Sequence, residues 1–548
     1  MGSVQRPITR PGGFRNLPNI ETLTSRLKNV QPIIEQICNT MGQVGLSYGV
    51  LYQGQVVLAR GYGDRDHENQ KPADENTLFN IASCTKAFTA TACALLAQEG
   101  SLDLNLPVKE YLPELKEEQA TLVDLLAHRT GYARLDTSWV GQRSEVLVSH
   151  AELIKRVNAL PKLRSLGSEW LYNNWMYAVA GVVVERHNKG HLTYMDFVKK
   201  CLLEAYCLTR SCIERKDIPD DNISLAYVAS RSRTALPIPE PPWEESPFTP
   251  GGGIRSCVVD MLKWSELLLA AYAADAKDAS SELRSPVSKH PGVIFSPKMI
   301  LPDAVSYGQL ERSYGMGFLR FMLPSKLSHG GRNATVASEV AIPPVGNNDD
   351  HTLALAHAGE NAGALSAFTL FPELDTAVIV LGNTTALGDT NELVMHLLSS
   401  QIMTSELQVD YTALATSIAE QCKSWHERTI SKPLSKHRVQ GTNAGSLEEY
   451  VGEYEGFEYS MKVSLESDGL ILHHGGRASQ RARLTHYHYD TFSFATSDYE
   501  EHLQLGMIDY DDWRLLLLHF ERDYSGAIVG IKWFLDGDIS PVLLGRKA

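Results

Sequence analysis

Ser83-Cys84-Thr85-Lys86 opens the run Ala87-Phe88-Thr89-Ala90-Thr91-Ala92-Cys93-Ala94-Leu95-Leu96-Ala97, which has no proline or glycine until Gly100. The run is rich in alanine and leucine and apolar on nearly every face, which predicts a helix buried all round. Ser83 stands at the expected N-cap, and Lys86 lies one turn along the same face. Near the positive end of a helix and away from water, a lysine loses part of its preference for the charged form. A neutral Lys86 can take the proton of the Ser83 hydroxyl, which makes Ser83 a candidate nucleophile. The alternative is an ordinary capped helix with a surface lysine, because S-x-x-K recurs by chance.

Composition, net charge and cysteine content restrict the class of protein. The 548 residues are 43% hydrophobic and 21% charged, which is ordinary for a globular protein with a substantial core. The formal net charge of -14 argues against a nucleic-acid partner bound through its phosphates. The eight cysteines include no C-x-x-C pair, so the sequence supports no metal site, and we expect no cofactor. We expect no membrane partner and a cytoplasmic location, because the sequence shows neither a secretion signal nor about 18 consecutive apolar residues.

Changes in sequence pattern divide the chain into four parts. Residues 1–20, rich in Pro, Gly and Arg, are expected to form an N-terminal arm. Residues 21–405 carry strand signals at both ends and helical signals between them, which predicts an α+β unit with a sheet packed on helices. Residues 406–445 are expected to form a helical linker. Residues 446–548 hold about eight short strand signals separated by turn residues, which predicts a small antiparallel β-barrel or sandwich.

The amino-terminal region contains a second serine motif, Gly45-Leu46-Ser47-Tyr48-Gly49, which has the form G-x-S-x-G. This motif marks a nucleophile only where a strand ends and a helix begins. Residues 46–51 and 55–59 instead predict two strands joined by a hairpin at Gln53-Gly54. We therefore interpret Ser47 as an ordinary strand residue. Before this hairpin, the apolar spacing over residues 20–41 predicts a helix.

Two further motifs follow the Ser83 motif along the chain, and they are Tyr172-Asn173-Asn174 and His357-Ala358-Gly359. The stretches 124–131 (Asp-Leu-Leu-Ala-His-Arg-Thr-Gly) and 252–256 (Gly-Gly-Ile-Arg-Ser) accompany them. In this order and at these intervals, the chain resembles the serine β-lactamase-like superfamily over roughly residues 20–405. It is most similar to the branch of class C β-lactamases, family VIII carboxylesterases, D-aminopeptidases and acyltransferases. The resemblance implies a transpeptidase-like α+β fold, with an antiparallel sheet flanked by helices and an all-helical subdomain.

The resemblance also implies a role for each matching residue. Ser83 matches the acylated nucleophile, and Lys86 matches the residue that accepts its proton. Tyr172 matches the tyrosine that acts with the lysine as general base and later activates the deacylating water, and Asn174 matches the asparagine that binds the substrate's amide or carbonyl.

The third motif, from His357 to Gly359, matches the strand that lines the site. The resemblance places the oxyanion between the backbone N–H groups of Ser83 and Glu360, and two such donors would typically contribute ~2.7–4 kcal/mol each. Taken singly, each residue also has an ordinary structural interpretation. Tyr172 could be an aromatic residue at the start of a helix, Asn174 an N-cap, and His128 a packing histidine.

The third motif departs from the superfamily's pattern. Where β-lactamases have the lysine of K-T-G, this sequence has His357, which removes a permanent cation for a β-lactam carboxylate. This departure favours an esterase, amidase, peptidase or acyltransferase over efficient antibiotic hydrolysis. His329-Gly330-Gly331 is a second candidate for the motif, but it lacks the strand–Pro pattern that residues 363–372 place after His357.

The C-terminal strands resemble the lipocalin-like module appended to some members of the superfamily. Our leading hypothesis is a cofactor-free serine hydrolase or acyltransferase that forms an acyl-Ser83 intermediate. Its substrate would be an ester, thioester or amide of a small metabolite or peptide in a biosynthetic pathway. The alternatives are a D-amino-acid peptidase or amidase, a β-lactamase, and a non-catalytic binding protein that retains the fold. The sequence predicts no particular oligomeric state.

Overall fold

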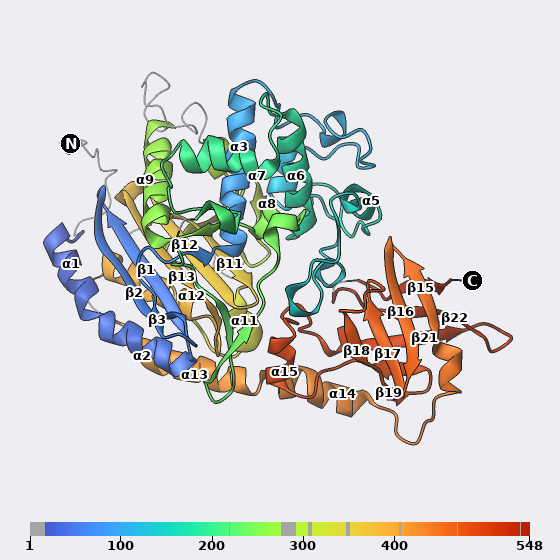
Figure 1. The fold of residues 1–548 in the computed structure, drawn as a ribbon. Coiled ribbons are helices and arrows are strands. Elements are labelled where there is room, and N and C mark those ends of the chain that lie inside the picture. The colour runs from blue at the N-terminus through green and yellow to red at the C-terminus, as the bar shows by residue number, and fades with distance from the viewer. Residues whose placement is uncertain are drawn as a thin grey trace.

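A computed structural model describes most of the chain, over residues 17–218, 220–275, 292–304, 310–346, 351–404, 407–467, 469–537 and 539–547. Residues 1–16 of the expected N-terminal arm lie outside the described residues. The described chain forms an α+β unit followed by a smaller β unit (Figure 1).

A nine-stranded antiparallel sheet is the centre of the α+β unit, with strand order β3-β2-β1-β13-β12-β11-β10-β9-β8. Its strands are β1 Gly45–Tyr52, β2 Gln55–Asp66, β3 Lys71–Pro72, β8 Met299–Ile300, β9 Arg312–Tyr314, β10 Leu319–Met322, β11 Leu353–Asn361, β12 Ala364–Phe371 and β13 Thr376–Gly382. The predicted hairpin at Gln53-Gly54 is confirmed as β1 and β2. Every residue of β1, β12 and β13 is buried, because helices cover both faces of the sheet there.

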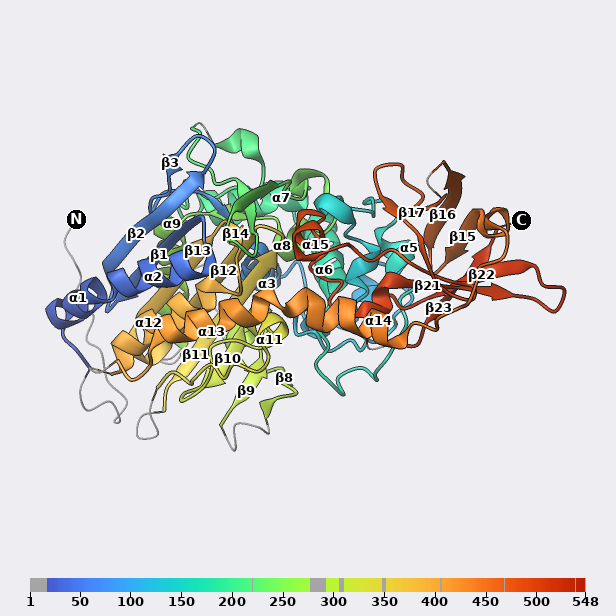
Figure 2. The ribbon, with the colours of Figure 1, turned by 90° about the horizontal axis from the view of Figure 1, so that it is seen from below.

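Helices from the two ends of the α+β unit cover one face of the sheet (Figure 2), and they are α1 Ile20–Asn29, α2 Gln31–Met41, α12 Thr390–Met403 and α13 Tyr411–Lys423. The opposite face packs against α9 Val258–Asp275, which contacts β1 and β13. The sequence predicted a single helix over residues 20–41, and the structure has two, divided at Val30. Pro32 explains the division, because proline is tolerated in the first turn of a helix but not in its interior.

The helical subdomain is built around α3 Thr85–Gln98, the helix that follows Ser83. The prediction of a helix buried all round is confirmed over its first nine residues, 85–93. Its neighbours include α6 Asn174–His187, α7 Tyr194–Val198 and α8 Thr249–Gly252. On the side facing α9, Phe88 stacks on Trp264 with ring centroids 4.4 Å apart. This helix therefore lies between the sheet layer and the other helices, which fixes the position of its N-terminus.

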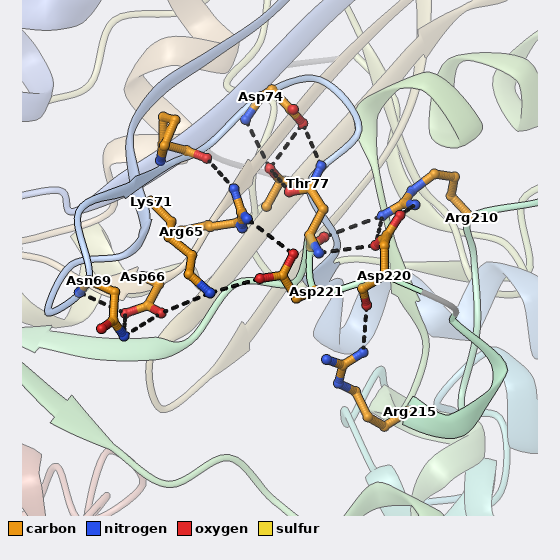
Figure 3. Close-up of polar contacts among 12 residues, drawn as sticks. Arg65, Asp66, Asn69, Lys71, Asp74, Thr77, Arg210, Arg215, Asp220 and Asp221 are labelled. Carbon is orange, nitrogen blue, oxygen red and sulfur yellow. Dashed lines mark hydrogen bonds and ion pairs between the residues drawn. The ribbon is translucent and has the colours of Figure 1, made fainter.

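A polar network ties the β2–β3 hairpin to the loop of residues 210–222 (Figure 3). Lys71 Nζ lies 2.7 Å from Asp221 Oδ2, and Thr77 Oγ1 donates to Asn222 Oδ1 at 2.7 Å. Thr77 also donates to Asp74 Oδ1 at 3.1 Å. Because β4 Phe79–Asn80 follows directly, the network fixes the path of the chain into Ser83.

The C-terminal unit is a nine-stranded antiparallel sheet that curls into a nearly closed barrel. Its strands are β15 Gly452–Gly456, β16 Tyr459–Glu466, β17 Gly469–His474, β18 Arg481–Arg483, β19 Thr485–His488, β20 Thr491–Ser493, β21 Leu517–Arg522, β22 Ile528–Trp533 and β23 Val542–Arg546. β18 and β19 are the two edges of the sheet, yet only Leu484 separates them in the chain. The interior is packed with side chains such as Tyr454, Met461 and Trp533. The specific likeness to lipocalins remains a prediction.

A helical segment connects the two units, and α13 and α14 Lys432–His437 run along the base of the molecule (Figure 2). The barrel unit carries a short helix, α15 Tyr499–Gln504, between β20 and β21. Arg231 of the α+β unit forms an ion pair with Glu500 of this helix at 2.8 Å. Among the described residues, no helix combines the length and the apolar character required to cross a bilayer.

Candidate active site

A strained turn presents Ser83. β4 pairs with β7 Arg255–Ser256, and Asn80 Oδ1 accepts a hydrogen bond from the Ala82 N–H at 3.0 Å. Ala82 has a φ of 44°, a left-handed conformation that non-glycine residues adopt only when their surroundings enforce it. The turn places Ser83 in a 3-10 segment just before α3. The sequence prediction that Ser83 caps the helix is wrong, because α3 begins at Thr85 and its cap residue, Cys84, makes no side-chain bond to the helix end. The Ser83 hydroxyl is directed to other partners instead.

Lys86 is the first of these partners. Its Nζ lies 2.9 Å from Ser83 Oγ and 2.8 Å from the carbonyl oxygen of Gly251. The side chain is completely buried, and burial lowers the pKa of Lys86 to about 7. Asp136 opposes this lowering of the pKa, and Arg134 adds to it. The Lys86 amine is therefore substantially neutral near pH 7, as the sequence predicted for a lysine removed from water.

Tyr172 is the second partner of the Ser83 hydroxyl. Its OH lies 2.8 Å from Ser83 Oγ, and the ring packs against His128 with centroids 4.2 Å apart. His128 Nδ1 accepts a hydrogen bond from the backbone N–H of Asn173 at 3.1 Å. Burial raises the pKa of Tyr172 above its usual value of about 10, so its phenol stays protonated at neutral pH. His128 is a packing histidine that orients the motif, in agreement with the ordinary interpretation of the sequence.

Asn174 faces a carboxylate that sequence reasoning missed. Its Nδ2 lies 3.2 Å from both oxygens of Asp136, which also contacts Arg134 Nε and Trp139 Nε1. The Asp136 side chain is only 4% exposed, so these donors replace water around the charge. Asn174 is the first residue of α6, and its neighbour Asn173 occupies the cap position without a side-chain bond to the helix end. Nothing in the local pattern of residues 129–139 distinguished Arg134 or Asp136.

The third predicted motif lies on β11, beside Ser83. A Cβ added to Gly359 would lie 2.4 Å from the Ile81 oxygen and 2.8 Å from the Ser83 nitrogen. Only glycine allows the strand to approach the turn this closely. The next residue, Glu360, directs its carboxylate to Arg332 Nη1 at 3.2 Å. The expected oxyanion donors, the N–H groups of Ser83 and Glu360, therefore belong to adjacent segments.

His357 does not supply a positive charge to the site. Its Nδ1 lies 2.6 Å from the Ala358 oxygen and its Nε2 lies 2.9 Å from the Tyr314 OH. Because a carbonyl can only accept, Nδ1 carries the proton and Nε2 accepts from Tyr314. Burial, together with the charge of Lys86, lowers the pKa of His357 to about 3. The imidazole is neutral at physiological pH.

The two alternative motifs lie elsewhere. Ser47 is buried in β1 and donates to the Asp74 oxygen at 2.7 Å, as expected of a strand residue. His329 precedes the short helix α11 Arg332–Val336, and its ring meets Trp170 edge-on at 4.9 Å. Neither residue reaches Ser83 in the way that Lys86 and Tyr172 do.

A groove of about 590 Å³ is bordered by Trp170. The centroid of the Trp170 ring lies 5.9 Å from that of Tyr172, so the groove lies near the motif tyrosine. Its lining residues are Ser168, Glu169, Trp170, Pro297, Lys298, Met299, Ile300 and Pro302. The groove is large enough for a small organic molecule or a short peptide segment.

Comparison with known families agrees with this geometry. Residues 33–397 match the family model described as Beta-lactamase. The chain belongs to the β-lactamase-like serine hydrolase superfamily. Residues 436–542 of this superfamily member match a second model, described as a domain of unknown function (DUF3471).

Curated relatives match this β-lactamase-like chain over part of their length. Protein flp of Staphylococcus aureus (strain NCTC 8325 / PS 47) is 27% identical over 253 residues, which are 44% of this chain and 49% of that protein. The human mitochondrial serine beta-lactamase-like protein LACTB is 22% identical over 363 residues, which are 53% of this chain and 65% of that protein. The chain thus spans about half to two thirds of the length of these relatives.

Solved structures share the fold. The octameric penicillin-binding protein homologue from Pyrococcus abyssi aligns with a TM-score of 0.53 at 19% identity, over 88% of this chain and 95% of that one. A beta-lactamase from Sulfitobacter sp. EE-36 aligns with a TM-score of 0.52 at 21% identity, over 70% of this chain and 98% of that one. At these identities the likeness concerns the fold alone.

Proposed function

We propose that the protein is a serine hydrolase or acyltransferase that forms an acyl-Ser83 intermediate on an ester, thioester or amide. One observation carries the proposal: the Ser83 hydroxyl lies 2.9 Å from the amine of a buried Lys86 whose pKa is lowered to about 7. A neutral amine at hydrogen-bond distance is what a general base for a serine nucleophile requires.

The pKa directions divide the work between Lys86 and Tyr172. Lys86 accepts the Ser83 proton as Oγ attacks the carbonyl carbon, and the backbone N–H groups of Ser83 and Glu360 bind the oxyanion. Tyr172, protonated and 2.8 Å from Oγ, donates a hydrogen bond to it and passes its proton to the leaving group. The Lys86 ammonium then returns the Ser83 proton to the Tyr172 phenolate, so both groups are restored. Asn174, held by Asp136, binds the substrate's amide or carbonyl. Water or a second nucleophile then releases the acyl group.

The neutral His357 bears on the substrate class. A β-lactam carboxylate would find no permanent cation at this motif, since the imidazole is neutral and occupied by Tyr314. Esters, thioesters and amides of small metabolites or peptides do not require such a cation. Peptidase or amidase activity on D-amino acids, and β-lactamase activity, are the alternative proposals, because the chain belongs to the β-lactamase-like superfamily. A non-catalytic binding role is a further alternative.

The test is covalent labelling followed by a substrate panel. Incubation with a fluorophosphonate and peptide mapping by mass spectrometry should place the label on Ser83. Label on Ser47, or none on the chain, would contradict the proposal. A panel of p-nitrophenyl esters of graded chain length, beside nitrocefin and D-alanyl amides, separates esterase, β-lactamase and peptidase activity. The ratio of products with added amines or alcohols separates transfer from hydrolysis.

A further inference from the structure

Arg134 connects the active site to the barrel unit. Its guanidinium carbon lies 5.8 Å from the centroid of the Tyr172 ring, and its Nε contacts Asp136. On the other side, Nη2 lies 3.0 Å from Oδ1 of Asp509, which belongs to the segment between α15 and β21. The side chains of Arg134 and Asp509 are 46% and 27% exposed, so water reaches this ion pair between the two units.

The charges of this chain act on Lys86. Asp136 raises the pKa of Lys86, whereas Arg134 lowers it. Asp509 touches Arg134 and not Lys86, so it acts by neutralising part of the Arg134 charge. The other titratable groups around Lys86 are Cys84, His128, His357, Tyr172 and Tyr177, and burial keeps each of them uncharged near pH 7.

We propose that Arg134, held beside the Tyr172 ring between Asp136 and the barrel residue Asp509, is a positioning residue that tunes the charge environment of Ser83 and Lys86 and thereby makes the C-terminal unit part of the active site. The proposal rests on the proposed function, in which neutral Lys86 is the base. Arg134 touches neither Ser83 nor Lys86 and acts on both through Tyr172, Asp136 and its electric field.

The two ends of the ion pair have opposite effects on the base. Arg134→Gln removes a cation and leaves Asp136 without its guanidinium partner, and both changes favour a protonated Lys86. Burial raises the pKa of Asp509 to about 7, so its carboxylate is only partly charged at the inflection. Asp509→Asn removes this partial negative charge and leaves Arg134 less neutralised, which favours a neutral Lys86. Asp511 and Glu360 also face Asp509, but they are present in both variants. If the contact were merely structural, the pKa of Lys86 would move in the same direction in both variants or would not move in either.

The experiment is the pH profile of fluorophosphonate labelling at Ser83 in the full chain. The wild-type rate should rise with pH through an inflection near the pKa of Lys86, about 7. We expect Arg134→Gln to move the inflection up by roughly one pH unit and Asp509→Asn to move it down by roughly 0.3 unit. Arg134→Lys keeps the charge and should restore the wild-type position of the inflection.

Matched controls come from the ion pair of Arg231 and Glu500, which also joins the two units but contacts none of the site residues. Arg231→Gln and Glu500→Gln repeat the same kinds of substitution and should leave the profile unchanged. The proposal would be overturned if the inflection moved in the same direction in Arg134→Gln and Asp509→Asn. It would also be overturned if the inflection stayed at the wild-type pH in both variants.

A second readout separates this proposal from the proposed function. The carbon-13 NMR titration of the Lys86 side chain, assigned by its loss in Lys86→Met, reports the protonation of Lys86 without any reaction. If Ser83 takes no label, the proposed function fails. Even then, a Lys86 titration that moves in opposite directions in Arg134→Gln and Asp509→Asn would support the role of Arg134. Titrations that coincide with the wild type would reject that role even in an active enzyme.

Discussion

Ser83 and Ser47 are both serines in recognisable motifs, and they differ in what their hydroxyls contact. Ser83→Ala should lower acylation by roughly 10³- to 10⁶-fold, because it removes the atom that forms the acyl bond. Ser47→Ala is the matched control. It loses a buried hydrogen bond to Asp74, which costs about 1 kcal/mol of stability, and should retain activity. Turnover with an activated ester measures the first effect and thermal unfolding the second. Equal loss of activity in both variants would contradict the assignment.

The Lys86 amine gives the enzyme a definite pH dependence. A lysine whose folded pKa is lowered from 10.5 to about 7 is protonated, and unable to act as base, below that pH. The rate of acylation should therefore fall about tenfold per pH unit below pH 7 and reach a plateau above it. The measurement is kcat/KM for a neutral ester between pH 5 and about 9. A profile that rises only near pH 10 would show that Lys86 keeps its ordinary pKa and would contradict the proposed base.

Individual site residues were predictable where a local motif defines them. Ser83, Lys86 and Tyr172 stand at fixed places in short motifs, and the structure brings their side chains into contact. Arg134 and Asp509 could not be found in this way, because 375 residues separate them in the chain. The predicted helix cap at Ser83 failed because the left-handed Ala82 turns the hydroxyl away from the helix end, and alanine gives no sign of such a conformation.

At the level of elements, β11 can approach the Ser83 turn closely because Gly359 has no side chain. Gly359→Ala would place a methyl group 2.4 Å from the backbone oxygen of Ile81, so the strand or the turn must move. We expect a loss of about 1–3 kcal/mol in stability and at least tenfold in the rate of Ser83 labelling.

Gly331→Ala tests the competing motif with the same substitution. A methyl group there meets nothing within 4 Å, so stability and labelling should stay near wild type. If Gly331→Ala and not Gly359→Ala impaired labelling, the third motif would lie at His329 instead of His357.

Strands and helices were predicted best where one residue pattern decides them. Alternation and turn residues located the β1–β2 hairpin and most strands of the barrel. The sequence predicted about eight short strands in this unit, and its sheet has nine, of which β18 and β19 lie on either side of Leu484. Closure of a sheet depends on pairing between distant strands, and the pattern of a single strand does not contain that information.

For the whole molecule, the boundary between the two units is packed like an interior. Most buried apolar residues of both units, from Leu23 to Leu544, form one contiguous core cluster. Polar contacts reinforce it, including Thr137 Oγ1, which donates to the Leu535 oxygen at 2.7 Å. The position of Asp509 beside Arg134 therefore depends on the docking of the barrel as a body, and this couples the stability of the barrel to the chemistry at Ser83.

Gln480 of the barrel tests that coupling. It is 2% exposed, its Oε1 accepts from the Gln142 N–H at 2.6 Å, and its Nε2 lies 2.6 Å from Glu145 Oε2. Gln480→Ala removes the partner of these partly buried groups and should cost about 1–3 kcal/mol. Lys155→Ala removes an exposed ion pair with Glu458 across the same boundary and should cost less than about 1 kcal/mol. Because the core is continuous, calorimetry should show one unfolding transition that Gln480→Ala lowers as a whole. Two separate transitions, of which Gln480→Ala lowers only that of the barrel, would show that the two units unfold independently. The barrel would then not be structurally coupled to the active site.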